Sequence, residues 1–315
     1  MASEIHNPRT DIRDAFFDRL YDLAAQDRDT LFLTADMGAL SLDRFKRDLP
    51  RQFINVGICE QSLVSIAAGL SLSGKKVFIY AITSFITQRC YEQIRIDLCG
   101  MRLPVVIVGS GPGICYGSDG GTHHAVEDIA LMRALPNLSI LNPSDPLSAS
   151  AAALMAHKSA NPVYVRLDKG KLPALHREEE DFSEGLRVLK KGRDVMLIST
   201  GVMVHKVFEL ADELAKHNID AGIIDLYRIK PINTELLLSY LNEYKKLVTI
   251  EEHILAGGIG SAICEIVADH GIAKPVKRIA IPDIPCSQYG DREWMHRYYG
   301  LDVQTMVGLI LQDCL

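Results

Sequence analysis

Several features are missing from this sequence, and each absence excludes a class of protein. No apolar run reaches the roughly 18 residues of a membrane-spanning helix, and the N-terminal segment lacks the apolar core of a signal peptide. No basic stripe is visible and the formal net charge is −6, which disfavours nucleic acid and anionic membranes as partners. We therefore expect a cytoplasmic globular protein that binds neither of them.

Cysteine motifs and repeats are also absent. The seven cysteines are scattered without CxxC or CxxxC spacing, so the sequence favours reduced thiols over a disulfide framework or a zinc site. No internal repeat and no low-complexity tract is present. The 48% hydrophobic and 23% charged residues are typical of a globular chain, and 315 residues suggest two domains.

Apolar segments with strand and helix patterns alternate along the chain, which predicts an α/β fold with two doubly wound domains. A charged stretch at about 168–184 interrupts the alternation, and we interpret it as a linker that ends a first domain at 1–184 and precedes a second at 185–315. The expected helices are 11–25, 60–72, 88–98, 125–135, 146–157, 202–217 and 261–270. The expected strands are 30–36, 53–57, 76–82, 104–109, 138–143, 162–167, 194–200, 220–226 and 246–252.

Three polar segments of the first domain follow predicted parallel strands. Glu60 follows the strand at 53–57, Thr83–Phe85 follow 76–82, and a glycine-rich loop follows 104–109. Ligands of such sheets bind beyond the carboxyl ends of the strands, so we expect these segments at one edge.

The glycine-rich loop, Gly109–Thr122, is long for a compact α/β unit, and such loops tend to be functional. It matches neither GxGxxG opening into a helix nor GxxxxGK[ST]. The residues after it allow either a metal cluster or an ordinary helix start, because acids favour a first turn. Two adjacent histidines diverge on a helix, which disfavours a shared metal ion. The residues considered are Asp119, near the end of the loop, and His123, His124, Glu127 and Asp128 after it.

Glu60 lies among apolar residues, where an ionised carboxylate is costly unless it is paired. It is either a helix-start acid stabilised by backbone amides or a catalytic group. No base, nucleophile or lysine lies near it in sequence, so any catalysis through Glu60 would use a cofactor's chemistry.

Five segments together resemble the C-terminal half of a transketolase, especially the split transketolases whose halves are separate chains. The resemblance covers the chain from about residue 10 onward, and it implies a pyrimidine-binding domain followed by a transketolase C-terminal domain. The segments are "FINVGICEQSLVSIAAGLSLSG", "SFITQRCYEQIR", "SDGGTHHAVEDIALMRALPN", "NPVYVRLDKGKLP" and "EEHILAGGIGSAICEI".

The resemblance implies thiamine diphosphate as cofactor. Glu60 matches the family's catalytic glutamate, which bonds N1′ of the aminopyrimidine and favours the imino tautomer that activates the thiazolium; an apolar setting would raise the pKa of such a carboxyl. Phe85 matches an aromatic residue that stacks on the pyrimidine, although Ile86 holds that place in the register of single-chain enzymes. Ile58 and Arg89 complete the expected cofactor contacts.

Other family positions concern the substrate. Asp119 and His123 match residues that hold donor hydroxyls, and His123 is also expected to be catalytic. Lys169 stands where an arginine usually holds the substrate phosphate, and a lysine lacks the bidentate fork. Gly111 departs most from the family pattern. Transketolases often have a histidine at this position, and deoxyxylulose-phosphate synthases have an arginine. A specialised substrate is therefore our hypothesis.

The family's GDG motif, which holds Mg²⁺ and the diphosphate, is absent from this chain. The resemblance thus implies a partner chain that carries the metal and diphosphate ligands, and no metal ligand here. Because family active sites lie between subunits, a two-plus-two assembly is expected.

Three alternatives remain for the function. One is the β subunit of a thiamine diphosphate-dependent oxo-acid or acetoin dehydrogenase, and another is a deoxyxylulose-phosphate synthase-like condensation. The third is a non-catalytic partner subunit. In the C-terminal domain we expect His253 to be a packed structural residue, and Arg228 and Lys230 to face solvent or a subunit interface.

Overall fold

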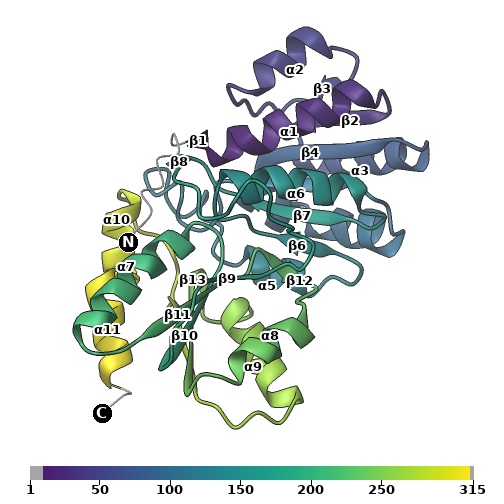
Figure 1. Cartoon of the computed structure of the whole chain (residues 1–315). Helices are drawn as coiled ribbons and strands as arrows, with labels where there is room; N and C mark the ends of the chain where they lie inside the picture. Colours follow the sequence, from purple (N-terminus) through teal and green to yellow (C-terminus); the bar gives the residue numbers. More distant parts are fainter. Residues whose placement is uncertain (1–9, 313–315) are drawn as a thin grey trace.

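A mostly parallel seven-stranded sheet forms the centre of the first domain in the computed structural model, which describes residues 10–312 (Figure 1). Only its edge strand β12 is antiparallel to its neighbour, and β12 comes from the C-terminal half of the chain. The strand order is β12 (Arg228–Lys230), β6 (Ser139–Leu141), β7 (Val163–Leu167), β5 (Val106–Ser110), β4 (Lys76–Ile82), β2 (Thr30–Thr34) and β3 (Phe53–Asn55).

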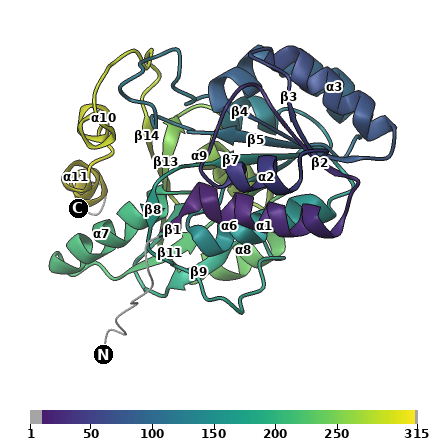
Figure 2. The ribbon, with the colours of Figure 1, turned by 90° about the horizontal axis from the view of Figure 1, so that it is seen from above.

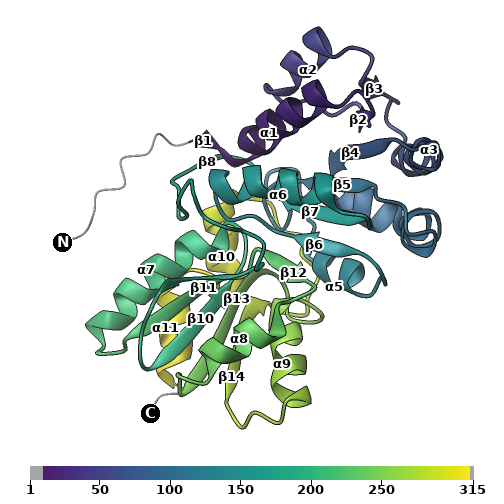
Figure 3. The same cartoon turned by 45° about the vertical axis from the view of Figure 1, so that its right-hand side comes forward.

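Helices cover both faces of this sheet, as the continuous apolar strands require. Side chains alternate along β4: Phe78 and Tyr80 pack on the face of α1, α2 and α6, while Val77 and Ile79 pack on the other. Figure 3 shows α1 and α6 side by side and α3 on the opposite face. The helical segments are α1 (Ile12–Gln26), α2 (Leu42–Asp48), α3 (Glu60–Leu72), η1 (Phe85–Arg89), α4 (Tyr91–Gln93), η2 (Ile94–Gly100), α5 (Asp128–Arg133) and α6 (Pro146–Lys158).

The second domain is built on a five-stranded sheet, parallel except for the edge strand β9. Figure 2 shows α7, α10 and α11 gathered on one side of it. The strand order is β14 (Val276–Ile281), β13 (Lys246–Ile254), β10 (Val195–Ser199), β11 (Ala221–Asp225) and β9 (Arg187–Lys190). The helices are α7 (Met203–Lys216), α8 (Thr234–Leu241), α9 (Ile259–Asp269), α10 (Arg292–Tyr299) and α11 (Val303–Gln312). A short ladder joins β1 (Thr10–Asp11) and β8 (Lys171–Leu172).

The two domains share one hydrophobic core. A single buried cluster contains Leu63 and Ile79 of the first domain together with Ile198, Leu237 and Ile263 of the second. Two further clusters fill the outer face of each sheet. Because β12 also pairs with β6, the second domain is attached to the first by packing and by backbone hydrogen bonds.

The prediction of two α/β domains is confirmed, and the elements Glu60–Leu72 and Lys76–Ile82 match their predicted bounds. The helix predicted at 88–98 is wrong in kind, because the segment is π-helical on both sides of α4. Thr87 Oγ1 donates to the Thr83 carbonyl at 2.7 Å and Cys90 Sγ to the Phe85 carbonyl at 3.4 Å. Such side-chain bonds to preceding carbonyls perturb an α-helical ladder.

The described cysteines, at positions 59, 90, 99, 115, 264 and 286, are free thiols, as expected; Cys314 lies outside the described residues. Burial raises the pKa of Cys90 to about 12 and that of Cys99 to about 11, so these thiols stay protonated at neutral pH. Between residues 10 and 312, no helix has the length and apolarity needed to cross a membrane.

A buried carboxylate–imidazole–carboxylate cluster joins the linker to both domains. His176 places Nδ1 3.2 Å from Asp145 and Nε2 3.5 Å from Asp225, and Ser144 donates to Asp225 at 2.5 Å. Burial raises the pKa of Asp225 to about 7 against the opposing effects of His176 and Ser144. Burial opposes ionisation of Asp145 as well, but the hydrogen bond and charge of His176 hold its pKa well below the usual range.

This cluster predicts a dependence of stability on pH. The native state holds a proton on Asp225 between about pH 4 and 7, where the unfolded carboxyl has lost it, so the free energy of unfolding falls as pH rises through this window. His176, whose pKa is raised by Asp145 and Asp225 against burial, acts in the same direction as pH rises through its folded pKa. Asp145, with a lowered pKa, contributes stability that is lost only below about pH 4.

We expect Asp225→Asn to flatten the pH profile by up to about 1.4 kcal/mol per pH unit between pH 4 and 7, since it removes one titrating group. Denaturant unfolding at a series of pH values measures this slope. Asp212→Asn, at an exposed position of α7, is the control and should leave the slope unchanged. An unchanged slope in Asp225→Asn would show that Asp225 does not titrate in this range.

Candidate functional site

The carboxyl ends of β2, β3, β4, β5 and β7 lie at one edge of the first sheet, because these strands are parallel and in register. Thr34 pairs with Asn55, Ile82 with Ser110, and Ser110 with Leu167. The segments that begin at Glu60, Phe85, Gly111 and Lys169 follow those ends within a few residues. The expectation that the polar segments meet at one edge is therefore confirmed.

Glu60 begins α3 and is buried, with 4% of its surface exposed. It has a cationic partner that its sequence neighbours do not reveal: Arg89 Nη1 donates to Glu60 Oε2 at 2.7 Å. The Arg89 side chain is 46% exposed, and its guanidinium also lies 4.5 Å from the centre of the Phe85 ring. A buried carboxylate, a half-exposed cation and an aromatic ring therefore adjoin each other.

Phe85, Ile86 and Ile58 differ in accessibility. Phe85 is half-buried at the start of η1, whereas Ile86 is completely buried in the hydrophobic core. Ile58 is 78% exposed on the loop before α3. Of the two neighbours on η1, Phe85 is therefore the one with ring surface that a ligand can contact.

The glycine-rich loop is docked on the second domain. Ile114 N donates to Glu252 Oε1 at 2.8 Å, and Gly290 N donates to the Gly117 carbonyl at 3.2 Å. A side chain at Gly113, where φ is +61°, would place its Cβ 2.2 Å from Glu252 Oε1. This glycine is therefore required by a close approach to a buried carboxylate.

Glu252 is the centre of a buried ionic group at the domain boundary. Its Oε2 accepts from Arg292 Nε at 2.8 Å and from His296 Nε2 at 2.5 Å. Arg292 also forms a bidentate salt bridge with Asp168, in which Nη1 donates to Oδ1 at 3.0 Å and Nη2 donates to Oδ2 at 2.7 Å. Burial alone would raise the pKa of Glu252, but Arg292 and His296 hold it well below its ordinary range. The group connects α10 and β13 to the loop and to Lys169, which follows Asp168.

His123 lies between two aromatic rings at the end of the loop. Its ring centre is 5.0 Å from that of Phe85 and 6.0 Å from that of Tyr116. The Lys169 ammonium lies over the second of these rings, 3.9 Å from the centre of Tyr116. Asp119 is exposed on the same loop. The structure thus brings His123, Phe85 and Lys169 together through Tyr116, a residue that the sequence analysis did not single out.

The Tyr116 ring occupies the space that a side chain at position 111 would need. The φ of Gly111 is +69°, and a Cβ built there would lie 2.0 Å from Cε2 of Tyr116. Burial raises the pKa of Tyr116 to about 12, so its phenol remains a hydrogen-bond donor at neutral pH. A tyrosine near a glycine in a loop has no distinctive sequence pattern, which explains why this pair was missed.

The residues after the loop serve the packing of the loop and α5. His124 Nδ1 lies 2.9 Å from the Cys286 carbonyl, Gln88 donates to Glu127 at 2.9 Å, and buried Asp128 accepts from Arg166 at 2.8 Å and Tyr164 at 2.6 Å. Within the described range 10–312, no three His, Cys, Asp or Glu residues are grouped as metal ligands.

His253 is fully buried, and its Nε2 accepts from Ala130 N at 3.2 Å, which confirms a packed structural role. Arg228 and Lys230 are both partly exposed, which agrees with the expectation, and each also holds backbone carbonyls. Arg228 donates to the carbonyls of residues 183, 184 and 231. Lys230 Nζ donates to those of Arg133 and Leu135, so it ties β12 to the first domain.

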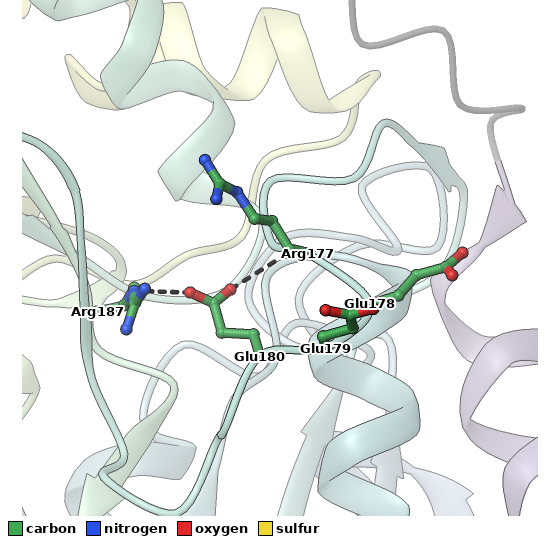
Figure 4. A pocket seen from close by; sticks show the side chains of 5 residues that line it. All are labelled: Arg177, Glu178, Glu179, Glu180 and Arg187. Atoms are coloured by element: carbon green, nitrogen blue, oxygen red, sulfur yellow. Dashed lines mark hydrogen bonds and ion pairs between the residues drawn. The ribbon is translucent and has the colours of Figure 1, made fainter.

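A separate cavity of about 490 Å³ lies in the linker region, and none of its lining residues belongs to this edge (Figure 4). Its lining is entirely charged. Glu180, the least exposed of its carboxylates, already forms an ion pair with Arg187 at 2.6 Å and accepts a hydrogen bond from Arg177 N at 3.2 Å. The lining residues are Arg177, Glu178, Glu179, Glu180 and Arg187. We therefore place the candidate site at the sheet edge.

Comparison with known proteins points to one family over both domains. Residues 9–174 match the model of the transketolase pyrimidine-binding domain, and 185–306 match that of the transketolase C-terminal domain. A subunit of the apulose-4-phosphate transketolase of Actinobacillus succinogenes is 35% identical over 85% of this chain and 86% of its own length. The 6-deoxy-6-sulfo-D-fructose transketolase subunit SqwH of a Clostridium species is 32% identical over 94% and 92%.

A solved structure supports the same assignment. A split-gene transketolase, described as an inactive beta4 tetramer, superposes with a TM-score of 0.87 at 32% identity. The match covers 96% of this chain and 97% of that chain.

Proposed function

This chain belongs to the transketolase family, as the pyrimidine-binding and C-terminal half of a split enzyme, and we propose that it moves a two-carbon ketol unit from a ketose to an aldose together with a diphosphate-binding partner chain. The observation that supports this most is the convergence of buried Glu60, accessible Phe85 and His123 at one edge of the pyrimidine-binding domain. In the reaction the C2–C3 bond of the ketose breaks, its remainder leaves as an aldose, and the two-carbon unit forms a new bond to the acceptor carbonyl carbon.

The pyrimidine-binding domain implies thiamine diphosphate, and the residues present fit its aminopyrimidine part. Phe85 offers a partly exposed ring for stacking, and Glu60 offers a carboxylate at hydrogen-bonding distance from a half-exposed donor, Arg89. When bound, the cofactor would supply a carbon nucleophile for the ketone carbonyl. Since residues 10–312 present no grouped metal ligands, we assign Mg²⁺ and the diphosphate to the partner chain.

Each residue of this chain has a distinct role in the proposal. Glu60 would hold a proton shared with N1′ of the pyrimidine, and the half-exposed Arg89, which now donates to Glu60, would lie beside the bound ring. His123 and Asp119 bind donor hydroxyls, and His123 moves a proton at a sugar oxygen, where an imidazole is suited to titrate. Ile58, exposed before α3, covers the cofactor from solvent when the partner docks.

Lys169 supports a proposal for the substrate class. Its ammonium stands at the rim of the site as a point charge for an oxyanion. The related subunits named above are described by an apulose phosphate and a sulfofructose, both of which end in a tetrahedral oxyanion. We therefore propose a ketose with a terminal phosphate or sulfonate as the donor.

The partner docks on the face of α3 beside Glu60. This face has a shallow cavity of about 620 Å³ lined by Gln61, Ser62, Ser65, Ile66 and Gln93. Ile66 is 41% exposed there, and Ile58 extends the apolar surface to the site. Exposed apolar residues continuous with an incomplete site are typical of a subunit interface. Two copies of each chain would then bury both sites.

We expect Ile66→Asp to weaken binding of the diphosphate-binding subunit by about 30-fold or more, because it places a charge in an apolar contact. Calorimetry or light scattering on the mixed chains measures this affinity. Gln304→Asp, at an exposed polar position of α11, is the control and should bind normally. Equal affinity of Ile66→Asp and the unmodified chain would place the interface elsewhere.

The function is tested by mixing this chain with a separate diphosphate-binding transketolase subunit from the same organism. Calorimetric titration of thiamine diphosphate and Mg²⁺ should show tight binding only in the mixture. A panel of ketoses with terminal phosphate or sulfonate is then assayed with an aldose acceptor. Turnover of pyruvate with an electron acceptor, and none of any ketose, would contradict the proposal and favour an oxo-acid dehydrogenase.

A further inference from the structure

We propose that Tyr116 is a specificity-determining residue, which separates the hydroxyl-binding and oxyanion-binding ends of the substrate site and holds Lys169 in place. This inference rests on the proposed function and deepens it. It is independent of any contact with the cofactor.

Tyr116 adjoins the two groups proposed to bind the two ends of the substrate, His123 and Lys169. Its ring adjoins both groups: the ring centre of His123 is 6.0 Å from that of Tyr116, and the Lys169 ammonium is 3.9 Å from the Tyr116 ring centre. A substrate whose hydroxyls reach His123 and whose oxyanion reaches Lys169 must therefore pass along Tyr116.

Packing against Gly111 fixes the position of the Tyr116 ring. The backbone at Gly111 has a φ of +69°, and the edge of the Tyr116 ring fills the volume that a Cβ would take. The bare backbone of Gly111 and the ring of Tyr116 therefore form one packing unit. Any side chain at 111 has to displace the ring, and with it the surface on which the lysine rests.

The Tyr116 ring in turn supports the side chain of Lys169. The lysine stem is flexible, so an unsupported ammonium would sample many positions. A cation over an aromatic face is attracted by the ring quadrupole, which restricts Lys169 to one side of the site. Removal of the ring should therefore weaken selection of an anionic substrate more than it weakens turnover in general.

The test compares kcat/KM of the assembled enzyme for an anionic ketose and for its neutral counterpart. We expect Tyr116→Leu to lower this ratio by about 3- to 30-fold, mainly through KM of the anionic substrate. Tyr116→Phe should retain most of the ratio because the ring remains. Parallel arms with a ketose phosphate and a sulfoketose show which oxyanion the site prefers.

Two further variants make the test specific. Gly111→Ala should lower the ratio as Tyr116→Leu does, and the double variant should be no worse than the single ones, because both remove the same placement of the ring. Tyr21→Leu is the matched control: Tyr21 also has a cation on its face, Arg44 at 3.6 Å, but it packs between α1 and α2. Its ratio should equal that of the unmodified enzyme.

The outcomes separate the two proposals. A ratio within twofold of the unmodified value in Tyr116→Leu, or additive effects in the double variant, overturns the inference while ketose turnover keeps the proposed function. No ketose turnover by the unmodified pair overturns the proposed function and this inference with it. As a readout besides turnover, calorimetric binding of ribose 5-phosphate against ribose to the assembled enzyme should lose its preference for the phosphate in Tyr116→Leu.

Discussion

We expect Glu60→Gln to lower kcat of the assembled enzyme by about 10²- to 10⁴-fold, the usual contribution of a positioned acid–base group. Gln keeps the shape of the side chain but cannot share a proton with a ring nitrogen in the same way. Because Arg89 is exposed enough to turn to water, the loss of the Glu60–Arg89 ion pair should leave folding nearly unchanged. Steady-state kinetics with a ketose donor and thermal unfolding of the same sample measure both effects.

Glu179→Gln, at an exposed position of the linker, is the matched control and should retain full turnover. If Glu60→Gln also retains turnover, this chain is a structural partner and catalysis does not pass through it. Loss of turnover together with normal binding of the partner chain supports the catalytic assignment.

The second large effect concerns stability and the position of the glycine-rich loop. We expect Arg292→Met to lower the free energy of unfolding by about 3–5 kcal/mol, the usual result of leaving buried charges without their partner. Both Glu252 and Asp168 lose their contacts with the guanidinium in this variant. Denaturant unfolding at pH 7 measures the change.

Arg297→Met, on the exposed side of the same helix, should cost less than about 0.5 kcal/mol. Because Glu252 also holds Ile114 N, Arg292→Met should raise KM for the donor even where the enzyme remains folded. An Arg292→Met variant as stable as Arg297→Met would mean that Glu252 and His296 suffice to hold the boundary.

The parts of the fold with strong local patterns could be predicted. Continuous apolar strands separated by amphipathic or small-residue helices point to buried parallel sheets, and 60–72 and 76–82 were placed at their observed bounds. The elements that were missed are short or depend on distant contacts. They are α2, α8, α10, α11, β1, β8, β9, β12 and β14.

The strand β12 illustrates why such elements escape a local pattern. It has three residues, it leaves its own domain, and it pairs with β6 of the other sheet with an irregular register. Nothing in "RIK" indicates that choice of partner. Likewise, the π-helical turn at 85–89 is accompanied by side-chain bonds to preceding carbonyls, whose formation depends on packing.

For the site, the order of the segments along the chain was enough to place Glu60, Thr83–Phe85 and the glycine-rich loop at one edge of a sheet. The roles expected of Glu60, Phe85, Asp119, His123 and Lys169 came from the resemblance to transketolases. Their partners were decided by the tertiary structure, because charges and rings from distant segments meet only after the sheets are assembled. Arg89 pairs with Glu60, Arg292 with Asp168 and Glu252, and Tyr116 fills the space at Gly111. Local sequence thus selects the chemistry of this protein, whereas long-range packing selects which groups face one another.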